Sequence, residues 1–353
     1  MSDHRFDPTV LAGELAQFAQ RTAALGPALQ AASNAATGGT PRELVWCDGK
    51  VSLHRYRAVA RPARVAPLLI VYALVNRPYI MDLEPERSLI RSLLARGLDV
   101  YLIDWGSPDG GDRFIGLDDY LNRFLHRAVQ HILDTQKIAA LNLLGVCQGG
   151  TFSLCYTAMH PERVRNLIAM VTPVDFKTPE NLLSKWAQGV DMQLMTRNGN
   201  VSGEFLNAVY LALMPFRLTQ QKYIALACAP QTPAQLETFM RMERWIFDSP
   251  DLAATAFREF TEWFFQQNRL ITGGLSIGAH VVDLAAITQP LLNIYATKDH
   301  LVPPSASIPL ESLVSSKDYE ALPVETGHIG MYVSGSSRQL VPAKIVDWLL
   351  ARR

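Results

Sequence analysis

Cysteine is scarce in this sequence, and charge of neither sign is in excess. The four cysteines, Cys47, Cys147, Cys155 and Cys228, are too few and too widely spaced for a disulfide framework, and none belongs to the C-x-x-C pair of a zinc ribbon. The 33 basic and 33 acidic side chains cancel, so nucleic-acid binding receives no electrostatic support. We therefore expect a soluble globular protein that binds no nucleic acid.

Long hydrophobic runs and the common cofactor motifs are absent as well. The longest largely apolar run, from Ala66 to Val75, is half of the roughly 20 residues that a membrane-spanning helix needs. The N-terminal letters MSDHRFDPT lack the charged and apolar regions of a signal peptide. The sequence has no P-loop, no G-x-G-x-x-G after a strand and no H-E-x-x-H. These absences predict a cytoplasmic chain with no transmembrane segment, no metal and no cofactor.

Apolar patterning predicts one large α/β unit behind a short N-terminal segment. Residues 8 to about 32 carry apolar side chains at helical spacing, and the small residues after them indicate a flexible linker up to residue 42. From about residue 50 onward, apolar stretches with a strand-like pattern alternate with stretches of helical pattern. This alternation predicts a parallel, doubly wound sheet. Strands are expected at 50–58, 68–75, 99–104, 141–146, 164–171, 291–296 and 318–324, and helices at 87–95, 118–135, 148–159 and from 338.

The alternation of strands and helices stops near Asp175 and returns near Pro290. The residues between them are rich in Trp, Phe, Met and Leu, with helical patches around 204–214 and 233–246. Such an insertion predicts a helical cap over the carboxyl ends of the strands, where open α/β sheets bind ligands. The expected domains are an N-terminal segment at 1–42, a core at 43–175 and 286–353, and a cap at 176–285.

The stretch Gly145-Val146-Cys147-Gln148-Gly149-Gly150 carries the central chemical signal. It follows the G-x-S-x-G nucleophile-elbow pattern of the α/β-hydrolase fold, with cysteine in the serine position. The flanking glycines leave room for a sharp turn from strand to helix, and the helix N-terminus favours a thiolate. The alternative is a buried structural cysteine beside glycines that only allow close packing. The strand before Cys147 and the helix after it favour the nucleophile.

A cysteine nucleophile needs a base and an acid that orients the base. In this fold they follow in the order nucleophile, acid, histidine, which excludes the histidines before Cys147: His4, His54, His126 and His131. Among the later histidines, His160 ends a helix and His280 lies in the expected cap. His328, between the last strand and the last helix, is the predicted base, with His300 as the alternative.

Asp299, in the loop after the strand LLNIYA, is the predicted acid, with Asp175 as its rival. His300 is then expected to help position the Asp299 loop, unless it is a simple surface turn residue. The oxyanion hole should use the backbone N–H of Gln148 and that of Val75, with Asn76 as the alternative to Val75. The cap aromatics are expected to serve more often as core than as substrate contacts.

A cysteine in the elbow suits a substrate that is itself a thioester. Exchange between a carrier thiol and an enzyme thiol is nearly thermoneutral, so the acyl group stays activated for transfer. A covered apolar pocket would keep water from taking that group. The sequence therefore predicts acyl transfer in preference to hydrolysis.

Several stretches together resemble the polyhydroxyalkanoate synthases, among them LLIVYALVNRPYIMDL, NLLGVCQGGTFSL, LNIYATKDHLVPP and ETGHIGMYVSG. The chain is most similar to the short catalytic subunit of the class III, two-subunit synthases, and class IV subunits are a close alternative. The resemblance implies polymerisation of (R)-3-hydroxyacyl-CoA, chiefly 3-hydroxybutyryl-CoA, into a growing polyester with release of CoA. It implies that Cys147 is acylated, that His328 activates it, and that Asp299 helps His328 deprotonate the 3-hydroxyl of the substrate.

The same resemblance implies a homodimer, a non-catalytic second subunit of the PhaE or PhaR type, and attachment to polyester granules in the cytoplasm. Two other functions remain open. One is a cysteine-dependent α/β-hydrolase, either a polyester depolymerase or an acyl-CoA thioesterase. The other is an inactive granule-coating protein, against which the intact set of Cys147, His328 and Asp299 argues.

Overall fold

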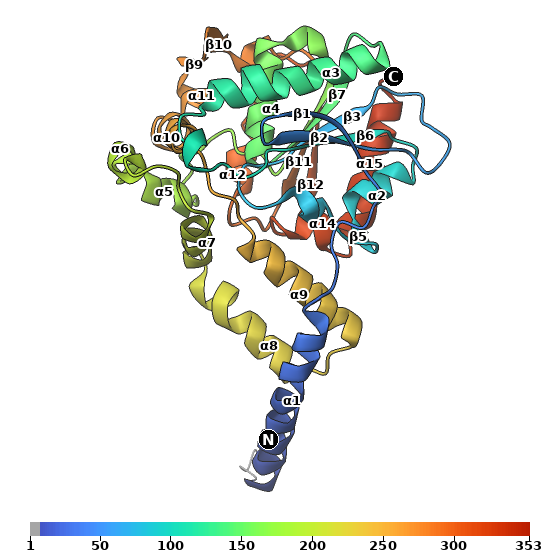
Figure 1. Cartoon of the computed structure of the whole chain (residues 1–353), viewed down its shortest axis with the longest axis vertical. Helices are drawn as coiled ribbons and strands as arrows, with labels where there is room; N and C mark the ends of the chain where they lie inside the picture. Colours follow the sequence, from blue (N-terminus) through green and yellow to red (C-terminus); the bar gives the residue numbers. More distant parts are fainter. Residues whose placement is uncertain (1–7) are drawn as a thin grey trace, which may run out of the picture.

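A central eight-stranded sheet organises the chain in the computed structural model, which describes residues 8–353 (Figure 1). The first seven residues, which include His4 and most of the stretch inspected for a signal peptide, lie outside the described part. The strand order is β1-β2-β6-β3-β7-β8-β11-β12. Pairing is parallel from β6 to β12, whereas β1 and β2 add antiparallel. The strands are β1 Glu43–Asp48, β2 Val51–Tyr56, β3 Leu68–Val71, β6 Val100–Asp104, β7 Leu141–Val146, β8 Val164–Met170, β11 Leu291–Ala296 and β12 Tyr319–Val324.

Two features of the sheet differ from the sequence prediction. Strand β1 was not expected, because its side chains show no regular alternation of burial. The strand expected over 68–75 ends at Val71, although Tyr72, Ala73 and Leu74 are buried as well. A continuous apolar run cannot distinguish a buried strand from a buried loop that follows it. That loop crosses the carboxyl end of the sheet, beside Cys147.

Helices cover both faces of the sheet, as the strand patterning predicts. Leu69 and Val71 of β3 pack into one apolar cluster with α3 (His126–Gln136) and α4 (Gln148–Met159). Leu68 and Ile70 pack into the opposite cluster with α2 (Leu89–Leu94) and α15 (Ser337–Leu350). Successive strand residues point to opposite faces, so a strand covered twice is apolar throughout. The α/β-hydrolase fold class is confirmed.

The segment between β8 and β11 is mostly helical and lies over the carboxyl ends of the strands (Figure 1). The helices expected near 204–214 and 233–246 are present as α7 and α9. The short hairpin of β9 (Leu275–Ile277) and β10 (His280–Val282) follows them. The helices are α5 Leu182–Gln188, α6 Met192–Thr196, α7 Gly203–Ala212, α8 Lys222–Cys228, α9 Pro233–Phe247, α10 Ala254–Phe260 and α11 Arg269–Thr272, with π-helical turns η5 Phe216–Gln221 and η6 Thr261–Gln266.

Shorter elements connect these layers. The predicted helix at 118–135 begins as a π-helical turn, η3, before it continues as α3. The remaining elements are η1 Pro78–Met81, β4 Asp82–Glu84, β5 Arg87–Ser88, η2 Gly110–Asp112, η3 Asp119–Leu125, η4 Pro161–Arg163, η7 Leu284–Ala286, α12 Pro304–Ser307, α13 Leu310–Leu313 and α14 Gly330–Val333. Among residues 8–353, no helix combines the length and the apolar character that crossing a membrane would require.

The N-terminal helix α1 (Pro8–Ala32) contacts the rest of the molecule mainly near its C-terminal end. The segment after it was expected to be a flexible linker, but it is bonded along its length. Asp82 accepts hydrogen bonds from the backbone and hydroxyl of Thr40, and Arg241 and Arg244 of α9 donate to the carbonyls of residues 33, 35 and 36. Composition alone could not reveal these bonds, because the donating arginines lie about 200 residues away in sequence.

Candidate active site

Cys147 occupies a sharp turn between β7 and α4, in the nucleophile-elbow geometry that the sequence predicts. Its backbone has φ 55° and ψ −123°, a region that ordinary side chains avoid. The turn is held because Cys147 N–H donates to the Met170 carbonyl at 2.9 Å. A Cβ on Gly149 would lie 2.2 Å from the Val71 carbonyl oxygen, and one on Gly150 would lie 1.8 Å from Thr172 Oγ1. Glycine at both positions is therefore a steric requirement of the elbow.

Cys147 and Cys155 occupy different environments. The buried structural cysteine is Cys155, eight residues further along α4, where burial raises the pKa of its thiol to about 12. Cys147 is only half-buried and lines a pocket, so its sulfur can reach a ligand. The purely structural alternative for Cys147 thus has no support in this packing.

His328 and Asp299 form a buried pair beside Cys147. His328 Nδ1 lies 2.7 Å from Asp299 Oδ2, while Asp299 Oδ1 accepts the backbone N–H groups of Leu301 and Val302, both at 2.9 Å. Burial acts to lower the pKa of His328, but the charges of Asp299 and Cys147, with hydrogen bonds to both, raise that pKa well above its usual value. Because Nδ1 is bonded to Asp299, Nε2 is the nitrogen left for the sulfur.

The alternative acid and base lie elsewhere. Asp175 Oδ1 accepts from the backbone of Lys177 and from Asn268 Nδ2, each at 2.9 Å, so it fixes a turn and does not orient His328. His300 lines the pocket, where burial lowers the pKa of its imidazole. Within residues 8–353 no hydrogen bond joins His300 to Asp299, whose loop is held by its own amides. His300 is therefore a residue of the pocket wall, and its help in positioning the Asp299 loop stays a prediction.

The two expected oxyanion donors lie on segments that are tied together. Gln148 and Val75 both line the pocket with Cys147. Gln148 Oε1 accepts the N–H of Leu74 at 2.9 Å, which joins the loop after β3 to the start of α4. The sequence identified Gln148 by its backbone position alone and missed this bond from its side chain. The bond fixes the separation of the two backbone N–H groups on which an oxyanion hole depends.

Asn76 fastens the same loop to the cap. It adopts a left-handed conformation, φ 57°, which asparagine tolerates better than most residues. Its Nδ2 donates to Ser249 Oγ at 2.9 Å and to the Trp245 carbonyl of α9 at 3.3 Å. Trp245 Nε1 in turn donates to the carbonyl of Arg77 at 2.7 Å. Asn76 is thus a structural link between core and cap, and Val75 remains the candidate donor.

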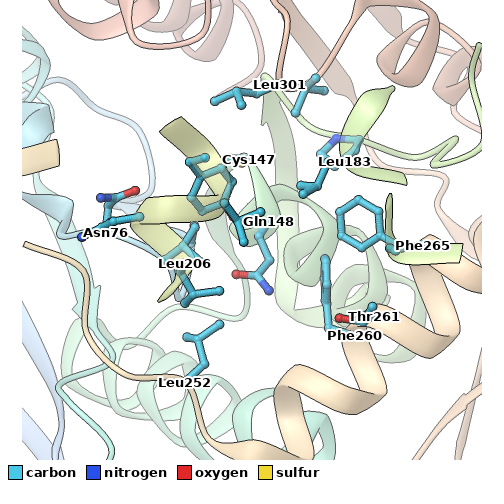
Figure 2. A pocket seen from close by; sticks show the side chains of 18 of the residues that line it. Asn76, Cys147, Gln148, Leu183, Leu206, Leu252, Phe260, Thr261, Phe265 and Leu301 are labelled. Carbon is cyan, nitrogen blue, oxygen red and sulfur yellow. The ribbon is translucent and has the colours of Figure 1, made fainter. Parts of the chain in front are cut away.

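The pocket has a volume of about 360 Å³ and is lined largely by apolar side chains. Figure 2 shows Cys147 and Gln148 facing a space bounded by Leu206, Leu252 and Phe260. The cap aromatics divide between the two roles considered for them. Trp186, Trp245 and Phe265 line the pocket, Phe264 is buried in the core, Trp263 packs against that core, and Phe247 is exposed.

Two tyrosines were not anticipated as site residues. Tyr72, from the loop after β3, and Tyr210, from α7, both line the pocket. Burial and the nearby Cys147 raise the pKa of each phenol well above its usual value. Both phenols therefore stay neutral in the wall of the pocket that Cys147 also lines. No spacing in the sequence connects them to the elbow, because they come from separate elements.

A second group of titratable side chains lies away from the pocket. The rings of His126 and His160 are 4.6 Å apart, and those of His160 and His280 are 5.1 Å apart, between centroids. Within the described residues, no three His, Cys, Asp or Glu side chains are arranged to hold a metal ion. Burial and the neighbouring histidines lower the pKa of His160 to about 4, and burial lowers the pKa of His126.

This histidine cluster predicts a specific acid sensitivity. As the pH falls from about 6.5 to about 4, the unfolded chain binds a proton at His160 that the folded chain does not, so the free energy of unfolding should fall. In His160→Gln this dependence should be flatter. Urea unfolding followed by circular dichroism across the range measures it. His131→Gln, on the same helix as His126 but outside the cluster, should keep the wild-type slope, and an unchanged slope in His160→Gln would contradict the assignment.

Comparisons with protein families and with solved structures identify the fold. The family described as alpha/beta hydrolase fold matches residues 66–334, and the one described as poly-beta-hydroxybutyrate polymerase (PhaC) N-terminus matches residues 26–93. A monoacylglycerol lipase from Paleococcus ferrophilus superposes with a TM-score of 0.52 at 16% sequence identity, over 85% of this chain and 99% of the lipase. At that identity the similarity extends to the fold alone.

Comparison with characterised sequences identifies the family. The poly(3-hydroxyalkanoate) polymerase subunit PhaC of Allochromatium vinosum is 49% identical over 351 residues, which are 98% of this chain and 98% of that protein. The protein of the same name from Synechocystis is 47% identical over 324 residues, 90% of this chain and 86% of that protein. The chain therefore belongs to the family of PhaC subunits of poly(3-hydroxyalkanoate) polymerases, enzymes with the α/β-hydrolase fold.

Proposed function

We propose that this chain polymerises (R)-3-hydroxyacyl-CoA, chiefly 3-hydroxybutyryl-CoA, into a polyester with release of CoA through a covalent thioester on Cys147. The observation that carries the proposal is the position of Cys147: it sits in the strained elbow, beside His328 and Asp299, at the wall of an apolar pocket. Membership of the polymerase family supports the reaction type. The proposed reaction needs no separate cofactor, because CoA arrives as part of the substrate and leaves as a product.

In the first step the sulfur of Cys147 attacks the thioester carbonyl of the substrate. A new C–S bond forms to Cys147, and the bond to the CoA sulfur breaks. The departing CoA thiolate takes its proton from the imidazolium of His328, whose pKa is raised by Asp299 and Cys147. Meanwhile the backbone N–H groups of Gln148 and Val75 stabilise the negative charge that develops on the carbonyl oxygen.

In the second step the 3-hydroxyl of an incoming acyl-CoA attacks the carbonyl of the chain held on Cys147. A C–O ester bond forms as the C–S bond to Cys147 breaks. His328, oriented by Asp299, takes the hydroxyl proton and returns it to the sulfur of Cys147. The lengthened chain, now carried on CoA, acylates Cys147 again and releases CoA.

The apolar lining favours transfer over hydrolysis, because water that enters would compete with the 3-hydroxyl for the same acyl group. Incubation with (R)-3-hydroxybutyryl-CoA tests this. The expected result is CoA release accompanied by insoluble polymer, with little free 3-hydroxybutyrate. The (S)-enantiomer serves as the control and should give neither product. Free 3-hydroxybutyrate as the sole product would contradict the proposal and favour a thioesterase or depolymerase.

The assembly belongs to the same proposal: a homodimer that associates with a non-catalytic second subunit, of the PhaE or PhaR type, at the surface of cytoplasmic polyester granules. The relative from Allochromatium vinosum is itself named a polymerase subunit, which supports an additional component. CoA release should accelerate when that component is added.

A further inference from the structure

The helix α1 (Pro8–Ala32) carries a regular stripe of mostly apolar side chains along one face. The positions alternate in steps of four and three residues, the spacing of a two-stranded coiled coil. The repeat persists for three heptads with one polar member, a threonine. Its members are Leu11, Leu15, Phe18, Thr22, Leu25, Leu29 and Ala32.

Only the second half of this stripe is covered. Leu25, Leu29 and Ala32 pack against an apolar group on α8 and α9 that comprises Leu226, Leu236, Phe239 and Met240. In the first half, Leu11, Leu15 and Phe18 are 41%, 59% and 41% exposed. Figure 1 shows this part of α1 extending past the ends of α8 and α9. The exposed half therefore continues a contact that the molecule already makes, on the same face of the same helix.

The two charges of α1 indicate what covers the exposed half. Glu14 and Arg21 are the only charged residues of the helix, and they lie seven residues apart on one edge of the stripe. Neither forms an ion pair within residues 8–353, and Arg21 Nε is buried without a hydrogen-bond partner. On the opposite edge, Ala12 and Ala19 are small, so a second helix can approach closely.

We propose that a second copy of this chain covers the stripe, as an antiparallel pair of α1 helices. When Leu15 of one copy faces Phe18 of the other, Leu11 faces Thr22 and Glu14 meets Arg21, once on each side of the two-fold axis. A parallel pair would place Ala19 beside Glu14 and leave both charges unpaired. The contact extends the proposed homodimer by naming its surface, and it does not rest on the chemistry at Cys147.

The overlap spans roughly 12 residues, about 18 Å of helix, so the contact is small and the association should depend on concentration. Sedimentation equilibrium of the full chain measures its dissociation constant. Glu14→Arg and Arg21→Glu should each raise that constant at least about tenfold, because each brings like charges together twice. The double variant with both reversals should return to within about threefold of wild type, because both pairs are restored with the signs exchanged. Lys317→Glu, a charge reversal at an exposed position outside α1, should leave the constant unchanged.

Only self-pairing in the antiparallel register gives rescue by the double reversal. A wild-type chain that is monomeric at all concentrations overturns the inference, as does a dimer that neither single reversal weakens. A double variant no better than the single ones overturns it as well, since a helix from a different protein or a parallel pair would give that result. Release of CoA from (R)-3-hydroxybutyryl-CoA is measured in parallel. Normal release by a chain that does not self-associate rejects this contact and leaves the proposed function intact.

Discussion

Replacing Cys147 with alanine is expected to lower CoA release from (R)-3-hydroxybutyryl-CoA by at least about 1,000-fold. The variant keeps the elbow, the histidine and the pocket but has no atom that can accept the acyl group. Mass spectrometry of the wild type after brief exposure to substrate should find one hydroxybutyryl adduct on the peptide that contains Cys147. The alanine variant should carry none.

Cys228→Ala is the matched control, because that cysteine is exposed and lies outside the pocket. It should retain wild-type release and the same adduct. Full turnover by Cys147→Ala would show that acyl transfer proceeds without a covalent intermediate at this position, and the proposed mechanism would then be wrong.

The second large effect concerns the division of labour between His328 and Asp299. His328→Gln should slow the acylation of Cys147 by at least about 1,000-fold. The variant has no imidazolium to stabilise the thiolate of Cys147 or to donate a proton to the departing CoA. Asp299→Asn should still be acylated, but chain extension should slow by at least about 100-fold. The reason is that removal of a proton from an alcohol demands a stronger base than activation of a thiol, and the carboxylate stabilises the imidazolium that forms. Rapid-quench experiments that score the adduct and the polymer separately distinguish the two steps.

Asp175→Asn is a suitable control for this pair. Its Oδ1 can still accept from Lys177 and Asn268, so the turn should persist and both steps should proceed at wild-type rates. Equal loss of acylation and extension in His328→Gln and Asp299→Asn would remove the separate role assigned to Asp299.

The positions of Cys147, His328 and Asp299 could be predicted because each is marked by a local sequence pattern or by its order along the chain. Cys147 is flanked by glycines whose absent side chains the turn requires. His328 and Asp299 each follow a strand, and parallel strands bring their carboxyl ends to one edge, where the two side chains meet at 2.7 Å. The sequence therefore predicted both members of the pair without any long-range information.

Other parts of the site depend on contacts that no local pattern encodes. Strand β3 ends at Val71, where the carbonyl of that residue packs so closely against the elbow that it leaves no room for a side chain at residue 149. The bond from Leu74 to the Gln148 amide spans 74 residues, and Tyr210 joins Cys147 in the pocket wall from a cap helix. Each arises only when separate elements are assembled, so apolar periodicity could not reveal it.

The bonds of the loop after β3 limit how the cap can open. Gln148 holds one end of this loop to the elbow, while Asn76 and Trp245 hold the other end to α9. If α9 moved outward as a lid, these bonds would draw Val75 with it, away from the position that the proposed oxyanion hole requires. In the structure, α9 is therefore tied to the elbow through this loop. On the other side of the cap, α5 to α7 border the same pocket through Trp186 and Phe205, and none of the bonds named above holds these helices to the loop.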